Sequence, residues 1–274
     1  MKKFKYIFGY TILITCAISM FLPFLWMIST SFMTNTEIFS TPPKFIPEKL
    51  NFANYINIFS HMPIAKYFFN SLFVSTITTI GQVLIASMAG YAFARFNFKY
   101  KEQLFIIILI TMMIPPQVNI IPLFCVMSKL NLIDTYSALI LPGFFGGFGI
   151  FLMSQWFIKL PKSIEEAAKI DGLNNFQIFF KIALPLAFPA VATLAIFTFV
   201  SSWNSFMWPL IAINTDAMKT LPVALAAFKG SYRETIVWGE IMACSVIAII
   251  PVILVFITGK KYFINDLLVG SLKD

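Results

Sequence analysis

Six long runs without a charged residue constrain the fold of this 274-residue sequence more than any other feature. A charged side chain costs several kcal/mol near the centre of a bilayer, so long charge-free runs mark segments that can cross a membrane. Each run has at least 19 residues, and about 20 helical residues span roughly 30 Å of hydrocarbon. The runs cover residues 6–36, 67–94, 103–128, 135–158, 182–215 and 241–259.

The composition places these runs in lipid. Hydrophobic residues make up 59 % of the chain and charged residues 12 %, whereas an ordinary globular domain is about 25 % charged. A soluble core of this size cannot hide 32 phenylalanines, so a soluble enzyme and a disordered chain are both excluded. We therefore expect an all-α, polytopic membrane protein with six transmembrane helices, near residues 7–29, 71–93, 104–124, 136–158, 186–211 and 239–258.

The charges between the runs predict the orientation, because short cytoplasmic loops carry an excess of Lys and Arg. Thirteen of the 20 basic residues fall on the side that holds both termini and the 159–185 loop, and seven fall on the other side. The N and C termini are thus expected in the cytoplasm. The net charge of +8 then reflects topology and not nucleic-acid binding.

Several kinds of chemistry are missing from the sequence. The six runs carry no ionisable side chain, which argues against a proton- or ion-coupled carrier, and His61 is expected to be a surface residue of the first outer loop. The phosphate-binding pattern Gly-x-x-x-x-Gly-Lys-Ser/Thr does not occur, so this chain cannot hydrolyse ATP by that means. The scattered cysteines, Cys16, Cys125 and Cys244, suggest neither a disulfide framework nor a metal site.

Prolines and glycines interrupt the apolar runs. The prolines either open a polar pathway or simply kink the helices; they are Pro115, Pro116, Pro122, Pro142, Pro189, Pro209 and Pro251. Gly143 and Gly147 have the Gly-x-x-x-Gly spacing, and close helix packing is expected there in preference to a ligand site.

The loop at 159–185 has a distinct pattern. Ser163 and Glu166 have capping-box spacing, and Gly172 suits a left-handed helix end. We expect a short helix, a turn and a second helix from about Asn175, followed by Pro185 at the entry to the next span. These features alone fit either a docking site or a plain loop.

The spacing of this loop resembles that of bacterial ABC importer permeases. The sequence reads Glu166-Ala167-Ala168, three residues, Gly172, nine residues, and then Ile182-x-Leu184-Pro185. Further stretches look like carbohydrate importer permeases, namely Ser202-Trp203-Asn204, Trp208-Pro209 and Thr220-Leu221-Pro222. The likeness is greatest to the second permease of the maltose-type heterodimer.

The resemblance implies a type I ABC importer permease fold. Residues 1–66 would hold the first helix and an outer loop, and residues 67–274 the permease core with its coupling loop at 159–185. The helix in that loop would occupy a cleft of an ATPase subunit, which the tail Leu267–Asp274 would also reach. The coupling residues carried over are Ser163, Glu165, Glu166, Ala167, Ala168, Asp171, Gly172 and Pro185.

The resemblance also implies partners and a location. The partners would be a second permease subunit, a pair of cytoplasmic ABC ATPases and an extracellular solute-binding protein docking on the outer loops 31–66 and 216–240. ATP and Mg would belong to the ATPases, so this chain would be no enzyme and would bind no cofactor. It would lie in the bacterial cytoplasmic membrane as a multi-pass protein.

The polar residues of the spans are candidates for the solute pathway. Hydroxyl and amide groups can bond sugar hydroxyls, and aromatic rings can cover sugar faces. The candidates are Ser202, Trp203, Asn204, Gln82 and Gln155, although Trp203 and Trp208 could instead belong to an outer aromatic belt. Many relatives have an acidic residue where this chain has Ser205, which weakens the transfer of polar contacts from them.

A di- or oligosaccharide is the expected solute. One alternative is glycerol 3-phosphate or another small organic solute carried by the same class of importer; a phosphate would require a basic pathway, and the spans supply no cation. The other alternative is a secondary carrier or channel acting alone, which the coupling loop and the absence of acids in the spans disfavour.

Overall fold

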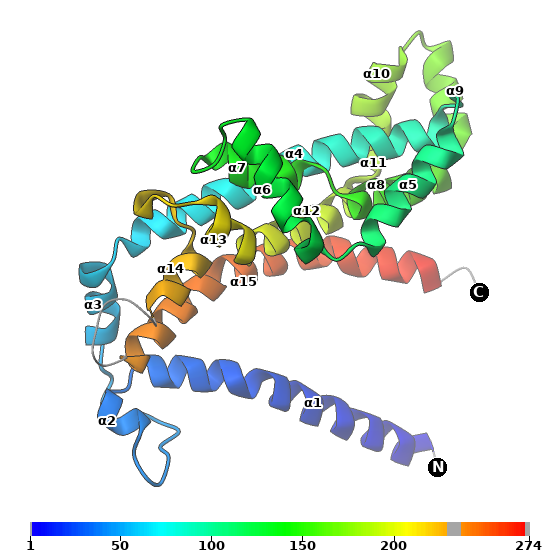
Figure 1. Ribbon diagram of the computed structural model, residues 1–274. Coiled ribbons are helices and arrows are strands. Elements are labelled where there is room, and N and C mark those ends of the chain that lie inside the picture. Colours follow the sequence, from blue (N-terminus) through cyan, green and yellow to red (C-terminus); the bar gives the residue numbers. More distant parts are fainter. Residues whose placement is uncertain (1, 229–236, 272–274) are drawn as a thin grey trace. The chain divides into compact units, whose positions relative to one another are not determined.

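The computed structural model describes residues 2–228 and 237–271, and every regular element in them is helical (Figure 1). Four segments are long and apolar enough to cross a membrane singly: Tyr6–Ser31, Ile64–Arg95, Tyr136–Lys159 and Trp238–Lys260. Two helix pairs meet the same criterion only when each pair is taken together: Lys101–Met113 with Pro116–Lys129, and Asn175–Leu186 with Phe188–Trp203. The prediction of an all-α membrane protein is confirmed, and the described residues hold four candidate spans, or six if each bent pair is counted as one span.

The chain divides into two compact units. The first contains residues 1–66 and 224–250, with helices α1 (Lys2–Ser31), α2 (Asn35–Ile38), α3 (Ala53–His61) and the beginning of α15 (Trp238–Ser271). Buried Asn54 joins these helices by donating to the carbonyls of Ser31 and Met33 at 2.9 Å each. His61 is exposed, as expected, and its Nδ1 lies 3.4 Å from an oxygen of buried Glu240.

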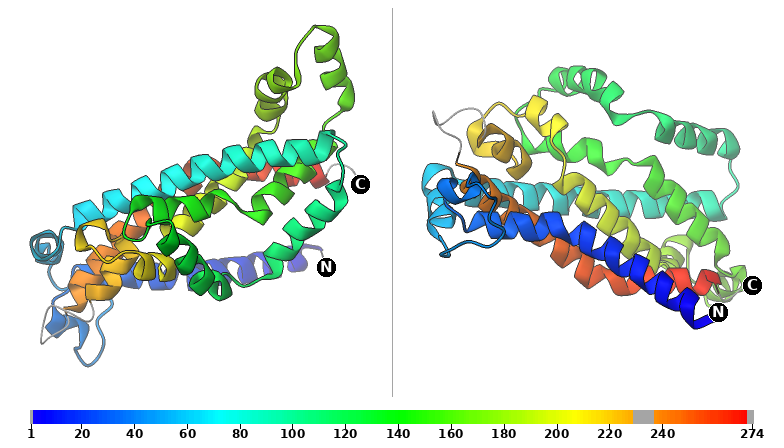
Figure 2. Two further views of the ribbon diagram at one scale, coloured as in Figure 1. Left: turned by 45° about the horizontal axis from the view of Figure 1, so that its top comes forward. Right: turned by 90° about the horizontal axis from the view of Figure 1, so that it is seen from below.

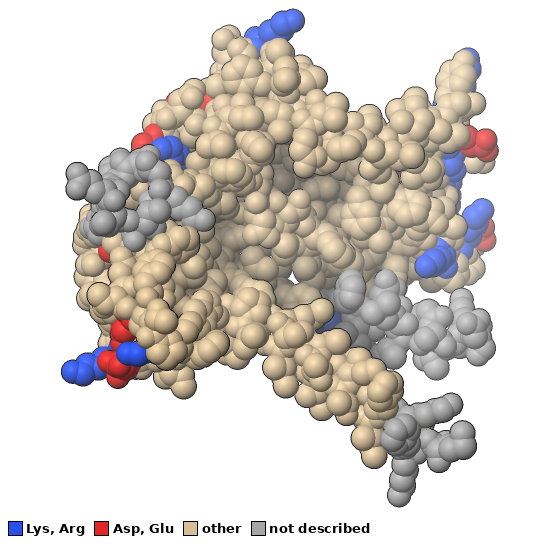
Figure 3. Space-filling view, turned by 60° about the horizontal axis from the view of Figure 1, so that its bottom comes forward, with Lys and Arg blue, Asp and Glu red and all other residues tan. Residues whose placement is uncertain are grey.

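The second unit contains residues 67–223 and 251–274. Its longest helix is α4 (Ile64–Arg95), visible in Figure 2 as one continuous cyan helix. The other elements of this unit that matter for function are α5 (Lys101–Met113), α6 (Ile120–Lys129), α7 (Tyr136–Ile140), α8 (Gly147–Lys159), α12 (Phe188–Trp203) and α13 (Met207–Ala212). The face drawn in Figure 3 has a broad surface without charged side chains, as a chain embedded in lipid requires.

Two predicted segments lie partly outside the described residues. Residues 272–274 of the predicted ATPase-contacting tail and residues 229–236 of the second predicted outer loop are not described.

Prolines mark several of the breaks. The third span bends by 99° where α5 ends before Pro115 and Pro116, and a short 3₁₀ turn, η1 (Pro116–Asn119), leads into α6. In the fourth span, Pro142 lies in a second such turn, η2 (Leu141–Phe144). Proline lacks an amide donor and clashes with the preceding helical turn, which explains both interruptions.

The span predicted near residues 186–211 is interrupted, but not at the prolines that the sequence pointed to. Helix α12 ends at Trp203 and α13 begins only at Met207, so the charge-free run contains a helix break. Asn204 caps the end of α12 with its backbone amide. Absence of charge therefore identified the apolar segment but carried no information about its helical continuity.

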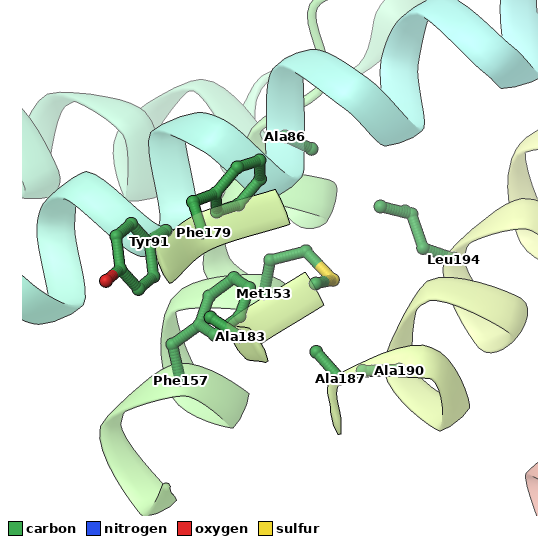
Figure 4. Packing of buried hydrophobic residues seen from close by; sticks show 9 residues of the cluster. All are labelled: Ala86, Tyr91, Met153, Phe157, Phe179, Ala183, Ala187, Ala190 and Leu194. Carbon is green, nitrogen blue, oxygen red and sulfur yellow. The ribbon is translucent and has the colours of Figure 1, made fainter. Parts of the chain in front are cut away.

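One buried core cluster of the second unit consists of nine residues from α4, α8, α12 and the segment between the last two (Figure 4). Glycines bring these helices close together: a Cβ on Gly90 would lie 2.7 Å from the Cβ of Met153. The packing role expected for Gly143 and Gly147 is confirmed, because added Cβ atoms would lie 2.4 Å from Thr78 and 2.9 Å from Met112. Small residues thus fix η2 and α8 against α4 and α5.

Candidate functional site

The loop between α8 and α12 forms a helical hairpin that projects from the second unit (Figure 1). Its limbs are α9 (Lys162–Ile170) and α10 (Asn175–Ile178), as the sequence predicted. The expected capping box of Ser163 and Glu166 is wrong, because α9 begins at Lys162 behind Pro161 and has no side-chain cap. A capping box forms instead on α10, between Asn174 and Gln177.

Gly172 ends α9 in the left-handed conformation that the sequence predicted, with φ of +82°. Its amide donates to the carbonyl of Lys169, and the amide of Leu173 donates to that of Ala168, each at 3.0 Å. This pair of bonds is a Schellman motif, which satisfies carbonyls that the helix end would leave free. Conformation alone requires glycine here, because no atom of the described residues lies within 4 Å of the position of a Cβ.

Helix α9 has a buried and an exposed face. Glu165 and Ala168, three residues apart, are buried. On the other side, Ile170 is 87 % exposed, beside exposed Glu166 and Ala167. The remaining candidate coupling residues, Ser163, Asp171, Gly172 and Pro185, are also exposed. An exposed isoleucine beside a small alanine gives a surface that another protein could cover closely.

Glu165 differs from the other candidates because its carboxylate is hydrogen-bonded to other side chains of the same chain. One carboxylate oxygen accepts a 2.6 Å hydrogen bond from Nε of Arg95, the last residue of α4. The other oxygen accepts a bond from the hydroxyl of Tyr91 at 3.2 Å. Arg95 also donates to the carbonyl of Leu160, directly after α8, at 2.8 Å.

Aromatic rings pack beneath this network. The rings of Phe157 and Phe179 both lie 5.3 Å from that of Tyr91. Phe179 begins a π-helical turn, η3 (Phe179–Ala183), on the second limb of the hairpin. Figure 4 shows Tyr91, Phe157 and Phe179 together, so α4 supports the hairpin through both of its limbs.

A cavity of about 410 Å³ lies elsewhere in the same unit, lined mainly by uncharged polar and apolar side chains. On α4 it is lined by Ser71, Ser75, Thr78 and Gln82, which the helical spacing places on one face. The other lining residues include Thr198, Ser201, Ser202, Ser205, Phe206 and Trp208. No Lys, Arg, Asp or Glu belongs to the lining that the described residues form.

The cavity holds two of the five predicted pathway residues, Gln82 and Ser202. Trp203 is 2 % exposed and packs on Phe68 and Phe199 instead. Asn204 is exposed and Gln155 half-buried, and neither lines the cavity. Roles for these three in a pathway stay predictions.

Sequence reasoning missed Ser71, Ser75 and Thr78. Their spacing of four and three residues along one predicted helix was the available signal. The hydroxyl oxygens of Ser75, Thr78 and Thr220 are buried and make no hydrogen bond to the described residues. These three hydroxyls border the cavity and can bond a polar ligand.

Three of the chain-breaking prolines also line the cavity, namely Pro116, Pro142 and Pro209. Of the two interpretations of the prolines, these positions favour the pathway. Pro189 lies in the first turn of α12 and Pro251 inside α15, and neither belongs to the lining.

Hydrogen bonds hold the loop at residues 216–219, which directly precedes the cavity-lining Thr220. Asn70 donates to the carbonyls of Ala217 and Lys219 at 3.0 and 2.9 Å. Asp216 accepts from Lys219 at 2.8 Å and from the hydroxyl of Tyr67 at 2.7 Å. The Lys219 bond, followed by the Tyr67 bond, lowers the pKa of the Asp216 carboxyl below its ordinary value.

Comparison with known proteins agrees with this geometry. The arabinooligosaccharides transport system permease protein of Halalkalibacterium halodurans is 38 % identical, over 92 % of this chain and 90 % of that protein. The lactose transport system permease protein of Rhizobium radiobacter is 31 % identical, over 99 % of this chain and 98 % of that protein.

A solved bacterial ABC transporter involved in the import of the acidic polysaccharide alginate has a chain of the same fold. That chain superposes with a TM-score of 0.85 at 25 % identity, and the match covers 95 % of this chain and 97 % of that one. Residues 82–267 match the model of one protein family, described as the binding-protein-dependent transport system inner membrane component. The chain belongs to this family of multi-pass inner membrane transport permeases.

Proposed function

We propose that this chain is a permease subunit of an ATP-driven importer for a neutral di- or oligosaccharide. The observation that carries the proposal is the uncharged, hydroxyl-rich cavity in the second unit. A sugar presents many hydroxyl groups and apolar ring faces. The cavity offers both kinds of partner, buried hydroxyls on α4 and the aromatic side chains Phe206 and Trp208.

The lack of charged residues among the described lining of the cavity distinguishes between neutral and anionic solutes. A phosphate or a uronic acid would leave a buried anion without a cationic partner here, which is costly. This argues against glycerol 3-phosphate, and against an acidic polysaccharide such as the one named for the structural relative. The relatives named for arabinooligosaccharides and lactose are consistent with a neutral solute.

Helix α9 would transmit the conformational change of the ATPase to this chain. Its exposed face, with Ser163, Glu166, Ala167 and Ile170, would contact a cleft of a cytoplasmic ABC ATPase, while Gly172 and Asp171 would shape its end. ATP and Mg would be bound by that ATPase, so this chain would catalyse no reaction. The family description supports a binding-protein partner, and a second permease would complete the pathway by alternating access.

Uptake into proteoliposomes tests this proposal. The chain is reconstituted with a partner permease, an ATPase and a binding protein from the same organism, and radiolabelled probes are offered with and without internal ATP. The neutral probes are arabinotriose, lactose and maltose, and the anionic probes are glycerol 3-phosphate and an alginate trisaccharide. We expect ATP-dependent uptake of at least one neutral probe and of neither anion.

Two outcomes would overturn the proposal. Uptake of the anionic probes alone would exclude a neutral solute. Uptake without ATP that a proton ionophore abolishes would identify a secondary carrier. A Glu166→Lys variant checks the docking face, and we expect it to lose co-purification with the ATPase while still inserting into the membrane.

A further inference from the structure

A buried ion pair joins the projecting hairpin to the long helix α4. The side chains of Arg95 and Glu165 are 6 % and 11 % exposed, and Nε of Arg95 lies 2.6 Å from Oε1 of Glu165. Seventy residues separate them in sequence. The pair therefore links two elements between which the chain passes through α5, η1, α6, α7, η2 and α8.

Each member of the pair has a second partner. Glu165 also accepts from the Tyr91 hydroxyl, and Arg95 also donates to the Leu160 carbonyl. A buried charge pair holds a geometry well only when its remaining donors and acceptors are satisfied, as they are here. Lysine could not reproduce this arrangement, because only a guanidinium reaches both acceptors in a fixed plane.

Helix α4 connects this pair to the cavity without interruption. It is helical from Ile64 to Arg95 and contains no proline. Gln82, which lines the cavity, precedes Arg95 by thirteen residues, and at 1.5 Å per residue the two are about 20 Å apart along the helix. Ser71, Ser75 and Thr78 extend the same lined face further from Arg95.

We propose that Arg95 and Glu165 are positioning residues that clamp α9 to α4, so that movement of α9 displaces the cavity-lining face of α4. This inference rests on the proposed docking of α9 to an ATPase. Glu166 and Glu165, adjacent in sequence, then have separate tasks. Glu166 faces the ATPase, and Glu165 transmits its movement within this chain.

The clamp is tested with five variants of the full-length protein, purified with its partner permease and ATPase. Arg95→Gln and Glu165→Gln each leave a buried charge unpaired. The double variant removes both charges, and Arg95→Lys keeps the charge but loses the two-point geometry. Lys99→Gln is the matched control, because it removes an exposed positive charge four residues beyond Arg95.

Hydrogen exchange over residues 162–171 reports the attachment of α9. We expect exchange at least about tenfold faster in each single Gln variant, because an unpaired buried charge favours local opening. Arg95→Lys should be intermediate and Lys99→Gln unchanged. The double variant should exchange more slowly than either single variant, a rescue that an additive loss of structure does not give.

Movement of α4 is measured with a reporter in the cavity. Gln82→Cys is introduced into a chain whose three native cysteines are replaced by alanine, and its reaction with a sulfonated thiol reagent is timed with and without ATP and vanadate. In the clamped protein the nucleotide is expected to change this rate several-fold. With Glu165→Gln added, the ATPase should still co-purify but the nucleotide effect should vanish.

The outcomes separate the clamp from the proposed function. If the ATPase fails to co-purify even with the unaltered chain, docking of α9 is wrong. If it co-purifies and the nucleotide effect at position 82 survives Glu165→Gln, the clamp is wrong. Equal exchange in all five variants would overturn it as well.

Discussion

At the scale of single residues, backbone conformation and not contact decides the importance of Gly172. An alanine at its φ of +82° would be strained, although none of the described residues crowds the position. We expect Gly172→Ala to destabilise the end of α9 by about 1 kcal/mol, the usual cost of a left-handed non-glycine residue. ATP-dependent uptake should fall while the protein still inserts, because the end of the docking helix loosens.

The chain offers a matched control for this substitution. Gly9 also has no atom within 4 Å of the position of a Cβ in the described part of the chain, but it lies inside α1 with an ordinary helical φ. Gly9→Ala should leave uptake unchanged and should not lower the midpoint of thermal unfolding in detergent. If both variants behave alike, the left-handed conformation is not what matters at Gly172.

At the scale of elements, close glycine contacts hold α4 against α8 beside the clamp. A Cβ on Gly90 would lie 2.7 Å from the backbone nitrogen of Ser154 as well as from Met153. Backbone cannot yield cheaply, so Gly90→Ala should destabilise the protein by about 1–3 kcal/mol. Gly259→Ala is the comparison, because among the described residues its Cβ would meet only the side chain of Ile196. A midpoint of thermal unfolding no lower for Gly90→Ala than for Gly259→Ala would contradict this.

Local patterns predicted the elements better than they predicted contacts. The α9–α10 hairpin follows from neighbouring residues, since Gly172 and Asn174 impose its turn and its second cap. The burial of Glu165 could not be predicted in the same way, because its partner Arg95 is 70 residues away. The break after Trp203 was missed for a related reason. Charge identifies which segments enter lipid and does not report where their backbones turn.

The candidate cavity was predicted in part. Ser202 and Gln82 were recognised because polar residues in apolar runs need partners. Trp203 shared that signal, yet ring contacts with Phe68 and Phe199 bury it in the core. Composition alone cannot separate an aromatic residue that lines a pathway from one that packs a helix.

At the scale of the whole molecule, the charge bias makes a prediction about orientation. With thirteen basic residues on one side of the spans and seven on the other, the 159–185 loop and both termini should lie in the cytoplasm. Cysteines at two strongly exposed positions can test this. Ile170 in α9 is 87 % exposed, and Ile46 between α2 and α3 is 79 % exposed.

In intact cells a membrane-impermeant maleimide should label Ile46→Cys but not Ile170→Cys. Permeabilised cells should show labelling of both, which controls for expression and reactivity. The chain without added cysteines measures background from Cys16 and Cys125, which are exposed on apolar helices. Labelling of Ile170→Cys in intact cells would show that the orientation is the reverse of the predicted one. It would also place α9 outside the cytoplasm, where no ATP is available to an ATPase. The same measurement therefore tests whether α9 can dock on a cytoplasmic ATPase.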